Sequence, residues 1–340
     1  MRGPALFSNE GSKGFSVSYS RRELLLAFGA MPLTHLLTRP GSIHAAARAL
    51  APSSKIGGVQ IGIIAPYAFR GTASTAEEIL DAVVALGISA VEMQSPPIEA
   101  FAGAPEPPPR RWRPGAGRPP EPTPEQREAR RAWVESMSAW RTSAPMAKLV
   151  ALREMYAQKG VQIYAFKLAL DETMSDAEYD YCFEAAKALG ASHVTMELNE
   201  STERIGRFAE KHEVHVGYHN HTQVDEHSWD AALEQSPYNG INLDVGHFTA
   251  AISKSPIPFI EKHHARITSV HLKDRTYGGE GADNLPWGEG DTPLREVLQL
   301  MKREGHTFPA TIELEYPVPD DSSVMAELQK CFDFCKEALA

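Results

Sequence analysis

The chain has 340 residues, and 42% of them are hydrophobic, which is enough for one large α/β barrel or two ordinary domains. The formal net charge is −10, although residues 1–50 carry six lysines and arginines against two glutamates, so the whole negative excess lies in the remaining chain. An acidic body matches a polyanion poorly, which argues against nucleic acid as a partner and favours small molecules.

The N-terminus carries the pattern of an export signal. Residues 20–26 read SRRELLL, a mostly apolar stretch continues to residue 37, and Ala-x-Ala patterns follow within residues 45–49. This order resembles a twin-arginine signal with a cleavage site, and an amphipathic helix or membrane anchor is the alternative. The apolar stretch is too short to span a bilayer. We therefore expect residues 1–50 to be a signal peptide and linker, and the mature protein to be periplasmic without a stable membrane span.

Short β-rich runs then alternate with helical patterns. Strands are predicted at residues 59–64, 90–93, 161–167, 193–197, 214–219, 241–244, 267–271 and 310–314, and helices at residues 75–86, 176–189, 202–212, 229–234, 257–264, 294–303 and 323–339. Glycines after several helical patterns mark their ends. Eight such units predict a (β/α)8 TIM barrel over residues 56–340. A doubly wound sheet is the alternative, but no glycine-rich phosphate motif follows the first strand.

A proline-rich insertion, residues 95–125, interrupts this alternation after the second strand. Residues 95–124 hold eleven of the chain's 25 prolines, and a charged helical pattern follows over residues 125–156. Proline fixes φ and removes a backbone donor, so we expect an irregular, extended segment on the surface. It would serve as a lid, as a contact in a homo-oligomer or as a disordered linker.

Four acidic and histidine residues, each at the end of a predicted strand, suggest a metal site: Glu197, Asp244, His271 and Glu313. The C-terminal ends of barrel strands meet at one face, which is where barrel enzymes carry their catalytic residues. Carboxylates and imidazole without thiolate suit one divalent ion such as Mn, Co, Mg or Zn. A metal enzyme is therefore the first hypothesis.

Three motifs make the chain resemble the xylose isomerase-like sugar isomerase and epimerase superfamily. They are Tyr-His-Asn-His at residues 218–221, Leu-Asp-x-Gly-His at residues 243–247 and His-Leu-Lys-Asp at residues 271–274. The resemblance implies that Glu197, Asp244, His271 and Glu313 hold one divalent metal. Glu315 shares a strand face with Glu313, but Glu313 comes first after the apolar run and is the preferred ligand.

The resemblance also implies a reaction. A keto-sugar bound through its carbonyl and adjacent hydroxyl would have its α-proton acidified by the metal. Glu197 and Glu313 would act as a pair of acid/base groups that remove and return this proton through an enediolate. His219 and His221 alternate at a strand end, so both should face the barrel interior or mouth, where they would bind hydroxyls or shuttle protons.

Two residues have the spacing of substrate-contacting positions in the family. Glu203 follows Glu197 by six residues, and His247 follows Asp244 by three. The alternatives are a helix N-terminal carboxylate for Glu203 and a core histidine for His247. The chain departs from the ketose 3-epimerases of the family at Tyr277, where they carry an arginine six residues after the histidine ligand.

Three further residues are candidate substrate contacts: Lys167, Glu92 and Trp287. Lys167 and Glu92 end the third and second predicted strands, where an interior ion pair is the alternative. Trp287 would stack on a sugar face or pack as an ordinary aromatic residue.

We expect a metal-dependent isomerase or epimerase acting on a keto-sugar or polyol ketone. A lyase or dehydratase of the inosose or 3-keto-glycoside type is the alternative, since it begins with the same proton abstraction and His219 or His221 would protonate the leaving group. A non-catalytic sugar-binding barrel is an alternative of another class. A metal endonuclease of the apurinic-site type is disfavoured, because Glu92 and Lys167 stand where those enzymes add histidine ligands.

Overall fold

The computed structural model describes residues 51–109 and 121–340. The predicted export signal, residues 1–50, and the centre of the proline-rich segment, residues 110–120, lie outside the described residues. Among the helices that the structure describes, none combines the length and the apolarity needed to cross a membrane.

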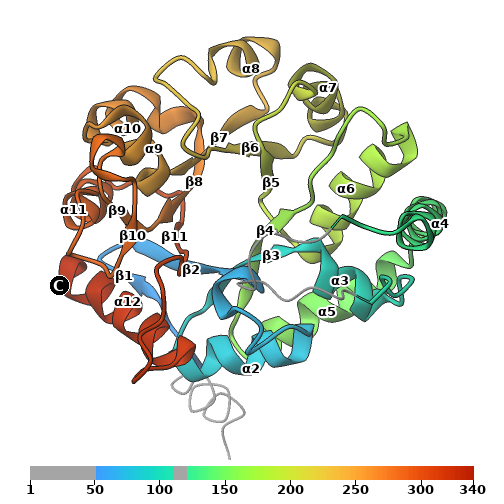
Figure 1. The fold of residues 1–340 in the computed structure, drawn as a ribbon, viewed down its shortest axis with the longest axis horizontal. Coiled ribbons are helices and arrows are strands. Elements are labelled where there is room, and N and C mark those ends of the chain that lie inside the picture. The colour runs from blue at the N-terminus through green and yellow to red at the C-terminus, as the bar shows by residue number, and fades with distance from the viewer. Residues whose placement is uncertain (1–50, 110–120) are drawn as a thin grey trace, which may run out of the picture. The chain divides into compact units, whose positions relative to one another are not determined.

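A closed parallel barrel forms the body of the described chain (Figure 1). Its strands are β2 (Val59–Ala65), β3 (Ala90–Gln94), β4 (Gln162–Lys167), β5 (His193–Glu197), β6 (His215–His219), β7 (Asn239–Asp244), β8 (Ile267–Leu272) and β11 (Ala310–Ile312). They follow one another in the order β2-β11-β8-β7-β6-β5-β4-β3, and pairing of β2 with β3 closes the ring. The short β1 (Lys55–Ile56) pairs antiparallel with β2, and β9 (Asp274–Arg275) forms a hairpin with β10 (Asn284–Leu285). The predicted TIM barrel is confirmed.

Helices surround the barrel, as the ribbon in Figure 1 shows. They are α2 (Ala76–Leu86), α3 (Ser95–Ala102), α4 (Pro124–Arg141), α5 (Met146–Gln158), α6 (Asp176–Leu189), α7 (Thr202–His212), α8 (Asp230–Gln235), α9 (Val245–Ile252), α10 (Ile257–His263), α11 (Leu294–Glu304) and α12 (Val324–Leu339), with 3-10 turns η2 (Tyr67–Phe69), η3 (His264–Arg266) and η4 (Gly278–Glu280). Capping boxes at Thr75 and Ser175 start α2 and α6, and Gly87 and Gly190 end them with φ of 77° and 73°.

The proline-rich segment is more regular than predicted. We expected residues 95–102 to be extended, but they form α3. The helix tolerates Pro96 and Pro97 because they lie in its first turn, where backbone N–H groups have no helical partner. The charged pattern of residues 125–156 forms two helices, α4 and α5, with Pro145 capping the second.

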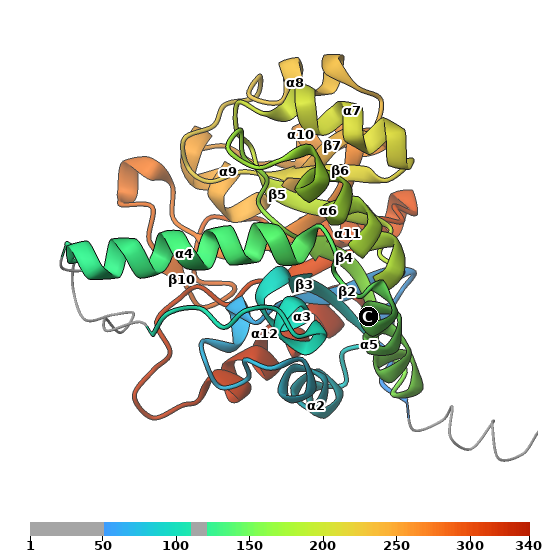
Figure 2. The same cartoon turned by 90° about the vertical axis from the view of Figure 1, so that its right-hand side faces the viewer.

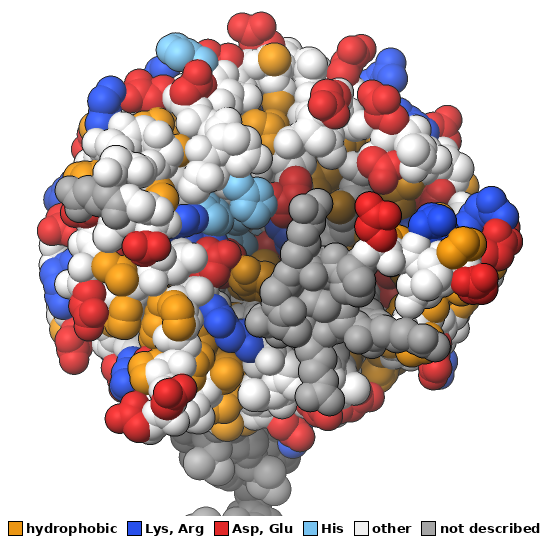
Figure 3. Space-filling model, in the orientation of Figure 1, with side chains coloured by type: hydrophobic (Ala, Val, Ile, Leu, Met, Phe, Trp, Pro, Cys, Tyr) orange, Lys and Arg blue, Asp and Glu red, His pale blue; other side chains and the backbone are white. Residues whose placement is uncertain are grey.

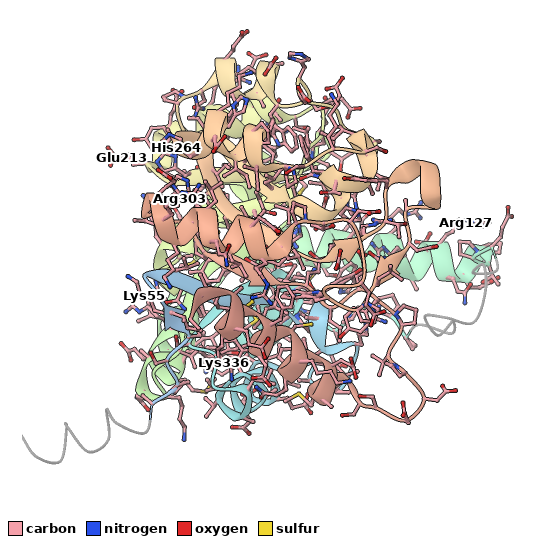
Figure 4. The ribbon with its side chains drawn as sticks, turned by 90° about the vertical axis from the view of Figure 1, so that its left-hand side faces the viewer. Lys55, Arg127, Glu213, His264, Arg303 and Lys336 are labelled. Carbon is pink, nitrogen blue, oxygen red and sulfur yellow. The ribbon has the colours of Figure 1, made fainter. Side chains whose placement is uncertain are left out.

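Helix α4 is mostly solvent-exposed. Met137 is its buried residue, and the helix runs along one side of the barrel (Figure 2). Figure 4 places Arg127, near the start of α4, on the side opposite Lys55, His264 and Arg303. His264 and Arg303 precede β8 and β11 in the chain, so α4 begins toward the face where the strands end.

Strand register brings the predicted functional residues together at this face. Asp244 at the end of β7 pairs with His271 of β8, and Glu197 at the end of β5 pairs with His219 of β6. Glu313 directly follows β11, and its N–H donates to Leu272 O over 3.1 Å. Five residues from five strands therefore meet around one point.

Candidate metal centre

The centre of the site is a buried cluster of four side chains: His219, Asp244, His271 and Glu313. Each can offer one nitrogen or oxygen, and these atoms all lie within 4.8 Å of one another. In Figure 3, histidine side chains lie with acidic and basic ones in the hollow at the middle of the face. The predicted set had Glu197 as its fourth member, whereas the compact group contains His219 and places Glu197 beside it.

His271 is held by carboxylates at both ring nitrogens. Nδ1 lies 2.5 Å from Glu313 Oε2, and Nε2 lies 2.7 Å from Glu92 Oε2. Burial lowers the pKa of His271, but Glu92 and Glu313 outweigh it and raise the pKa to about 10. A carboxylate behind a metal-binding histidine orients its other nitrogen toward the ion, so Glu92 aims Nδ1 at the cluster.

Glu92 does not occupy the position of a substrate contact. It lies within β3, is fully buried, and its Oε1 accepts a hydrogen bond from Thr195 Oγ1 at 2.6 Å. Burial raises its pKa, but the neighbouring His271 reverses the shift, so that the net pKa is lowered. The interior ion pair, which was the alternative for Glu92, is the arrangement found.

Asn242 fixes the orientation of His219. His219 Nδ1 lies 2.6 Å from Asn242 Oδ1, while Asn242 Nδ2 donates to Ser269 Oγ over 2.6 Å. Since Asn242 thus presents its oxygen, His219 Nδ1 is the donor and Nε2 keeps its lone pair. Burial, together with Lys167, lowers the pKa of His219 well below its usual value, so the ring is neutral. A neutral imidazole with a free nitrogen is what a divalent ion binds.

Two carboxylate oxygens support the fit of a cation. Asp244 Oδ1 accepts the N–H of His247 at 2.7 Å and so caps α9, a helix that the sequence analysis did not predict. Asp244 Oδ2 and Glu197 Oε2 each face a basic side chain: Lys273 Nζ lies 3.0 Å from Asp244 Oδ2, and His221 Nε2 lies 2.9 Å from Glu197 Oε2. Carboxylate oxygens in such surroundings are also ligands that divalent metal ions take. The donor set therefore fits a divalent cation.

Glu197 lies beside the cluster and nearer to solvent. Its side chain is 40% exposed, with Lys167 Nζ 3.0 Å from Oε1 and His221 Nε2 2.9 Å from Oε2. Burial raises the pKa of Glu197, but His221 and Lys167 outweigh this and lower it overall. Contact with Glu197 raises the pKa of His221. Glu197, His221 and Lys167 thus form a charged group at the mouth, and Lys167 makes the ion pair that was its alternative role.

His247 is buried beside the mouth rather than exposed in it. Its Nε2 lies 3.0 Å from Lys273 Nζ, its Nδ1 contacts Arg275, and its ring centre is 4.9 Å from that of His221. Burial and the two cations lower the pKa of His247 to about 3, so it is neutral. This chain does have an arginine here, Arg275, four residues after His271. The ketose 3-epimerases carry theirs six residues after the histidine ligand, where this chain has Tyr277.

The sequence analysis gave no role at the site to Lys273 or Tyr67, and it did not predict that Glu315 contacts Lys273. Lys273 Nζ lies 2.8 Å from Glu313 Oε1 and 2.7 Å from Glu315 Oε2, and Tyr67 donates to Glu315 Oε1 over 2.9 Å. Burial lowers the pKa of Lys273, but Asp244 and these glutamates raise it overall. The sequence could have indicated these three residues only by their position, because each lies within a few residues of the C-terminal end of a strand.

Two predicted substrate contacts lie away from the cluster. Glu203 is exposed in the first turn of α7, and its nearest charged partner is Arg207 at 3.8 Å, which agrees with the helix N-terminal alternative. Trp287 packs edge-on against Phe334 of α12 with 5.7 Å between ring centres. It lines a separate cavity of about 480 Å³ with residues of α12.

A larger cavity, of about 1010 Å³, opens at the opposite face. Its lining includes His193 and His215, which begin strands, and His264 and His306, which precede them. In TIM barrels this face serves stability, whereas catalysis takes place where the strands end. We therefore place the functional site at the histidine–carboxylate cluster.

Comparisons with known proteins agree with the fold. A family model described as xylose isomerase-like TIM barrel matches residues 140–335. No curated protein matches the chain.

Solved structures show a similar fold. An uncharacterised protein from Parabacteroides distasonis is 23% identical over 82% of this chain and 99% of that one, with a TM-score of 0.53. A sugar phosphate isomerase/epimerase from the same organism is 14% identical over 83% and 97%, with a TM-score of 0.51. The probable 3-DHS dehydratase AsbF from Bacillus anthracis is 13% identical over 81% and 98%, with a TM-score of 0.54. At these identities the likeness is one of fold.

Proposed function

The chain belongs to the xylose isomerase-like TIM-barrel family, and on that premise we propose that it is a divalent-metal-dependent isomerase or epimerase of a keto-sugar or polyol ketone. The observation that carries the proposal is the buried cluster of His219, Asp244, His271 and Glu313. Nitrogen and oxygen donors within 4.8 Å of one another suit a divalent cation, which a barrel that only binds sugar would not need.

Asp244, His271 and Glu313 would hold the ion, with His219 or Glu197 as the fourth ligand. When bound, Mn, Co, Mg or Zn would polarise the substrate carbonyl and acidify the adjacent carbon-bound hydrogen. Glu92 and Asn242 keep the histidine nitrogens aimed at the cluster through hydrogen bonds of 2.7 and 2.6 Å. These outer contacts are the preorganisation that such a site requires.

Glu197 is the residue best placed to remove the substrate proton. It is ionised and partly exposed at the mouth, and its Oε2 lies 2.9 Å from His221 Nε2. Lys167, 3.0 Å from Oε1, would stabilise negative charge that develops on the substrate oxygen. Glu313 would return the proton from the other side, since it reaches the same centre from β11. Two carboxylates from opposite sides of the ring of strands suit an epimerisation or isomerisation through an enediolate.

Deuterium exchange tests this proposal. Purified protein of known metal content would be incubated in D2O with free ketoses, inososes and 3-keto-glycosides, and each mixture followed by NMR. We expect deuterium at a carbon next to the carbonyl of an otherwise intact sugar. A metal-loaded sample that exchanges no proton in any of them would contradict the proposal and favour a sugar-binding barrel.

One observation favours a lyase as the second candidate. His221 is half-exposed at the mouth, and the neighbouring Glu197 carboxylate raises its pKa, which favours the protonated ring. An imidazolium there would protonate a leaving group β to the carbonyl after Glu197 has taken the α-proton. Loss of a substituent in the same NMR assay would identify this reaction. His221→Gln should then abolish elimination while deuterium exchange continues.

A further inference from the structure

Lys273 is a buried lysine at the centre of the site. Its side chain is 2% exposed, and its Nζ lies 3.0 Å from Asp244 Oδ2, 2.8 Å from Glu313 Oε1, 2.7 Å from Glu315 Oε2 and 3.0 Å from His247 Nε2. A buried ammonium is costly unless it is paired and hydrogen-bonded, and this ring of acceptors meets that need. Lys273 is therefore held in the cluster by charge.

The backbone around Lys273 is shaped to admit it. A Cβ added to Gly246, in the first turn of α9, would lie 2.4 Å from Lys273 Cγ and 2.5 Å from Lys273 O. Helix α9 can pack this closely on the lysine because residue 246 has no side chain. The glycine of Leu-Asp-x-Gly-His and the lysine of His-Leu-Lys-Asp therefore fit each other, and the place of Lys273 is fixed by two elements.

The four partners of Lys273 fall into two pairs. Asp244 and Glu313 belong to the proposed ligand set, and they meet Lys273 through Oδ2 and Oε1, the oxygens of theirs that neither cap α9 nor contact His271. Glu315 and His247 lie outside the compact cluster of four. Glu315 is also hydrogen-bonded to the exposed Tyr67 and is itself partly exposed, so it can hold an ammonium without the help of the cluster.

We propose that Lys273 is a built-in competitor of the metal: it neutralises Asp244 and Glu313 when no cation is bound, and it withdraws to Glu315 and His247 when one binds. The reason is electrostatic. A divalent ion and an ammonium repel each other, and both need the same two oxygens at short range. Lys273 thus weakens metal binding and stabilises the protein without metal. The inference rests on the proposed function, because it requires that the cluster takes a divalent cation.

Cobalt titration of variants tests this inference. Protein treated with EDTA and dialysed would be titrated with Co²⁺, with binding followed by calorimetry and by visible absorption, and melting measured with and without the ion. For Lys273→Met we expect a Kd for Co²⁺ at least about tenfold lower than in the wild type, because a positive charge has left the cluster. Without the ion, this variant should melt at a lower temperature, since Asp244, Glu313 and Glu315 lose their shared cation.

Glu315→Gln should act in the opposite direction. It removes the charge to which Lys273 withdraws, so the Kd for Co²⁺ should rise by about threefold or more. In the double variant Lys273→Met/Glu315→Gln this effect should disappear, because no lysine remains to be moved. Lys211→Met is the matched control, since Lys211 pairs with Asp180 on the surface, 2.5 Å away.

The outcomes separate the two proposals. If wild-type protein binds Co²⁺ and Lys273→Met binds it no more tightly, the inference is wrong while the metal site stands. If neither protein binds Co²⁺, the metal site itself is wrong, and the inference fails with it. Should Lys273→Met not fold, Glu315→Gln still decides, because an unchanged or lower Kd in that variant contradicts a withdrawal of Lys273 to Glu315.

Discussion

Glu313 and Glu315 follow the same strand, and their surroundings separate their roles. Glu313 contacts His271 within the buried cluster, whereas Glu315 accepts from Tyr67 and from Lys273 at the mouth. The preference for Glu313 as ligand rested on its position directly after the apolar run. Its contact with His271 is the feature expected of a ligand.

Metal analysis of two variants checks this assignment. Glu313→Gln should weaken metal binding by about a hundredfold or more, because it removes one charged oxygen donor from the cluster. Glu315→Gln should retain most of the bound metal at saturating concentration. Elemental analysis after dialysis against Mn²⁺ gives both results. A greater loss in Glu315→Gln than in Glu313→Gln would reverse the assignment, and His271→Ala serves as the variant in which loss is expected in either case.

The strand-end residues were predictable, and the residues behind them were not. Asp244, His271 and Glu313 end apolar runs, and parallel strands bring such ends together. A lysine directly after a strand is ordinarily expected to reach solvent, since lysine is almost never fully buried unless paired. The burial of Lys273 depends on Asp244, Glu313 and Glu315, and the sequence does not show that they converge on it.

At the scale of elements, Asp274 of β9 organises the loop that precedes α11. Its carboxylate accepts the N–H groups of Gly288 at 2.7 Å, Gly290 at 3.1 Å and Thr292 at 3.2 Å. A Cβ on Gly290 would lie 2.4 Å from Asp274 Oδ1, so the loop is closely packed on this acceptor. Through these hydrogen bonds Asp274 connects β9 to the loop that leads into α11.

Asp274→Ala should therefore lower the free energy of unfolding by about 2–4 kcal/mol, because three backbone donors lose a charged acceptor. Urea denaturation measures this loss. Asp225→Ala is the control, since Asp225 also accepts a backbone N–H, from His227 at 2.9 Å, but in an exposed turn. Equal losses in the two variants would show that the loop does not depend on Asp274.

His193 at the start of β5 makes the stability of the barrel depend on pH. It is buried, with Nε2 3.1 Å from Ser269 Oγ of β8, and burial lowers its pKa from 6.5 to about 4. Between these values the unfolded chain binds a proton that the folded chain does not, so stability is lost as the pH falls from about 6.5 to about 4. The loss from this one residue should be about 2 kcal/mol at pH 4.5, an order-of-magnitude value.

Urea unfolding at pH 7.5 and 4.5 tests this effect. His193→Gln keeps a polar group near Ser269 but cannot titrate, so the difference in stability between the two pH values should shrink by about 2 kcal/mol. His227→Gln, at an exposed position, should leave the difference as in the wild type. An unchanged difference in His193→Gln would mean that His193 does not make this contribution.

Helix boundaries were predicted well where capping residues mark them. Helices α6 and α7 begin and end at the predicted residues, because Ser175 and Gly190 mark the two ends of α6 and an amphipathic pattern fills α7. Helix α3 was missed because its prolines read as an irregular segment. Helix α9 was missed because it begins within a motif that was interpreted for its chemistry, and its N-cap is Asp244 itself.

At the scale of the whole molecule, the sequence divides by charge into a basic N-terminal part and an acidic body. Residues 51–340 hold the barrel, which was predictable because eight strand patterns alternate with helical ones, and residues 1–50 lie outside the described residues. Export to the periplasm therefore remains a proposal from the residues alone. A twin-arginine route carries folded proteins, which suits a barrel whose proposed metal site forms only when five strands have closed.

Changing Arg21 and Arg22 to Lys tests the proposed route, because the pathway reads the arginine pair rather than its charge, which both residues keep. In a bacterium with a working twin-arginine system, the double variant should accumulate in the cytoplasm, and its periplasmic fraction should fall sharply in an immunoblot of fractionated cells. Arg39→Lys, in the same segment but outside the motif, should be exported like the wild type. If the double variant still reaches the periplasm at the wild-type level, the twin-arginine proposal is wrong, whereas that result does not bear on the barrel or on the proposed metal site.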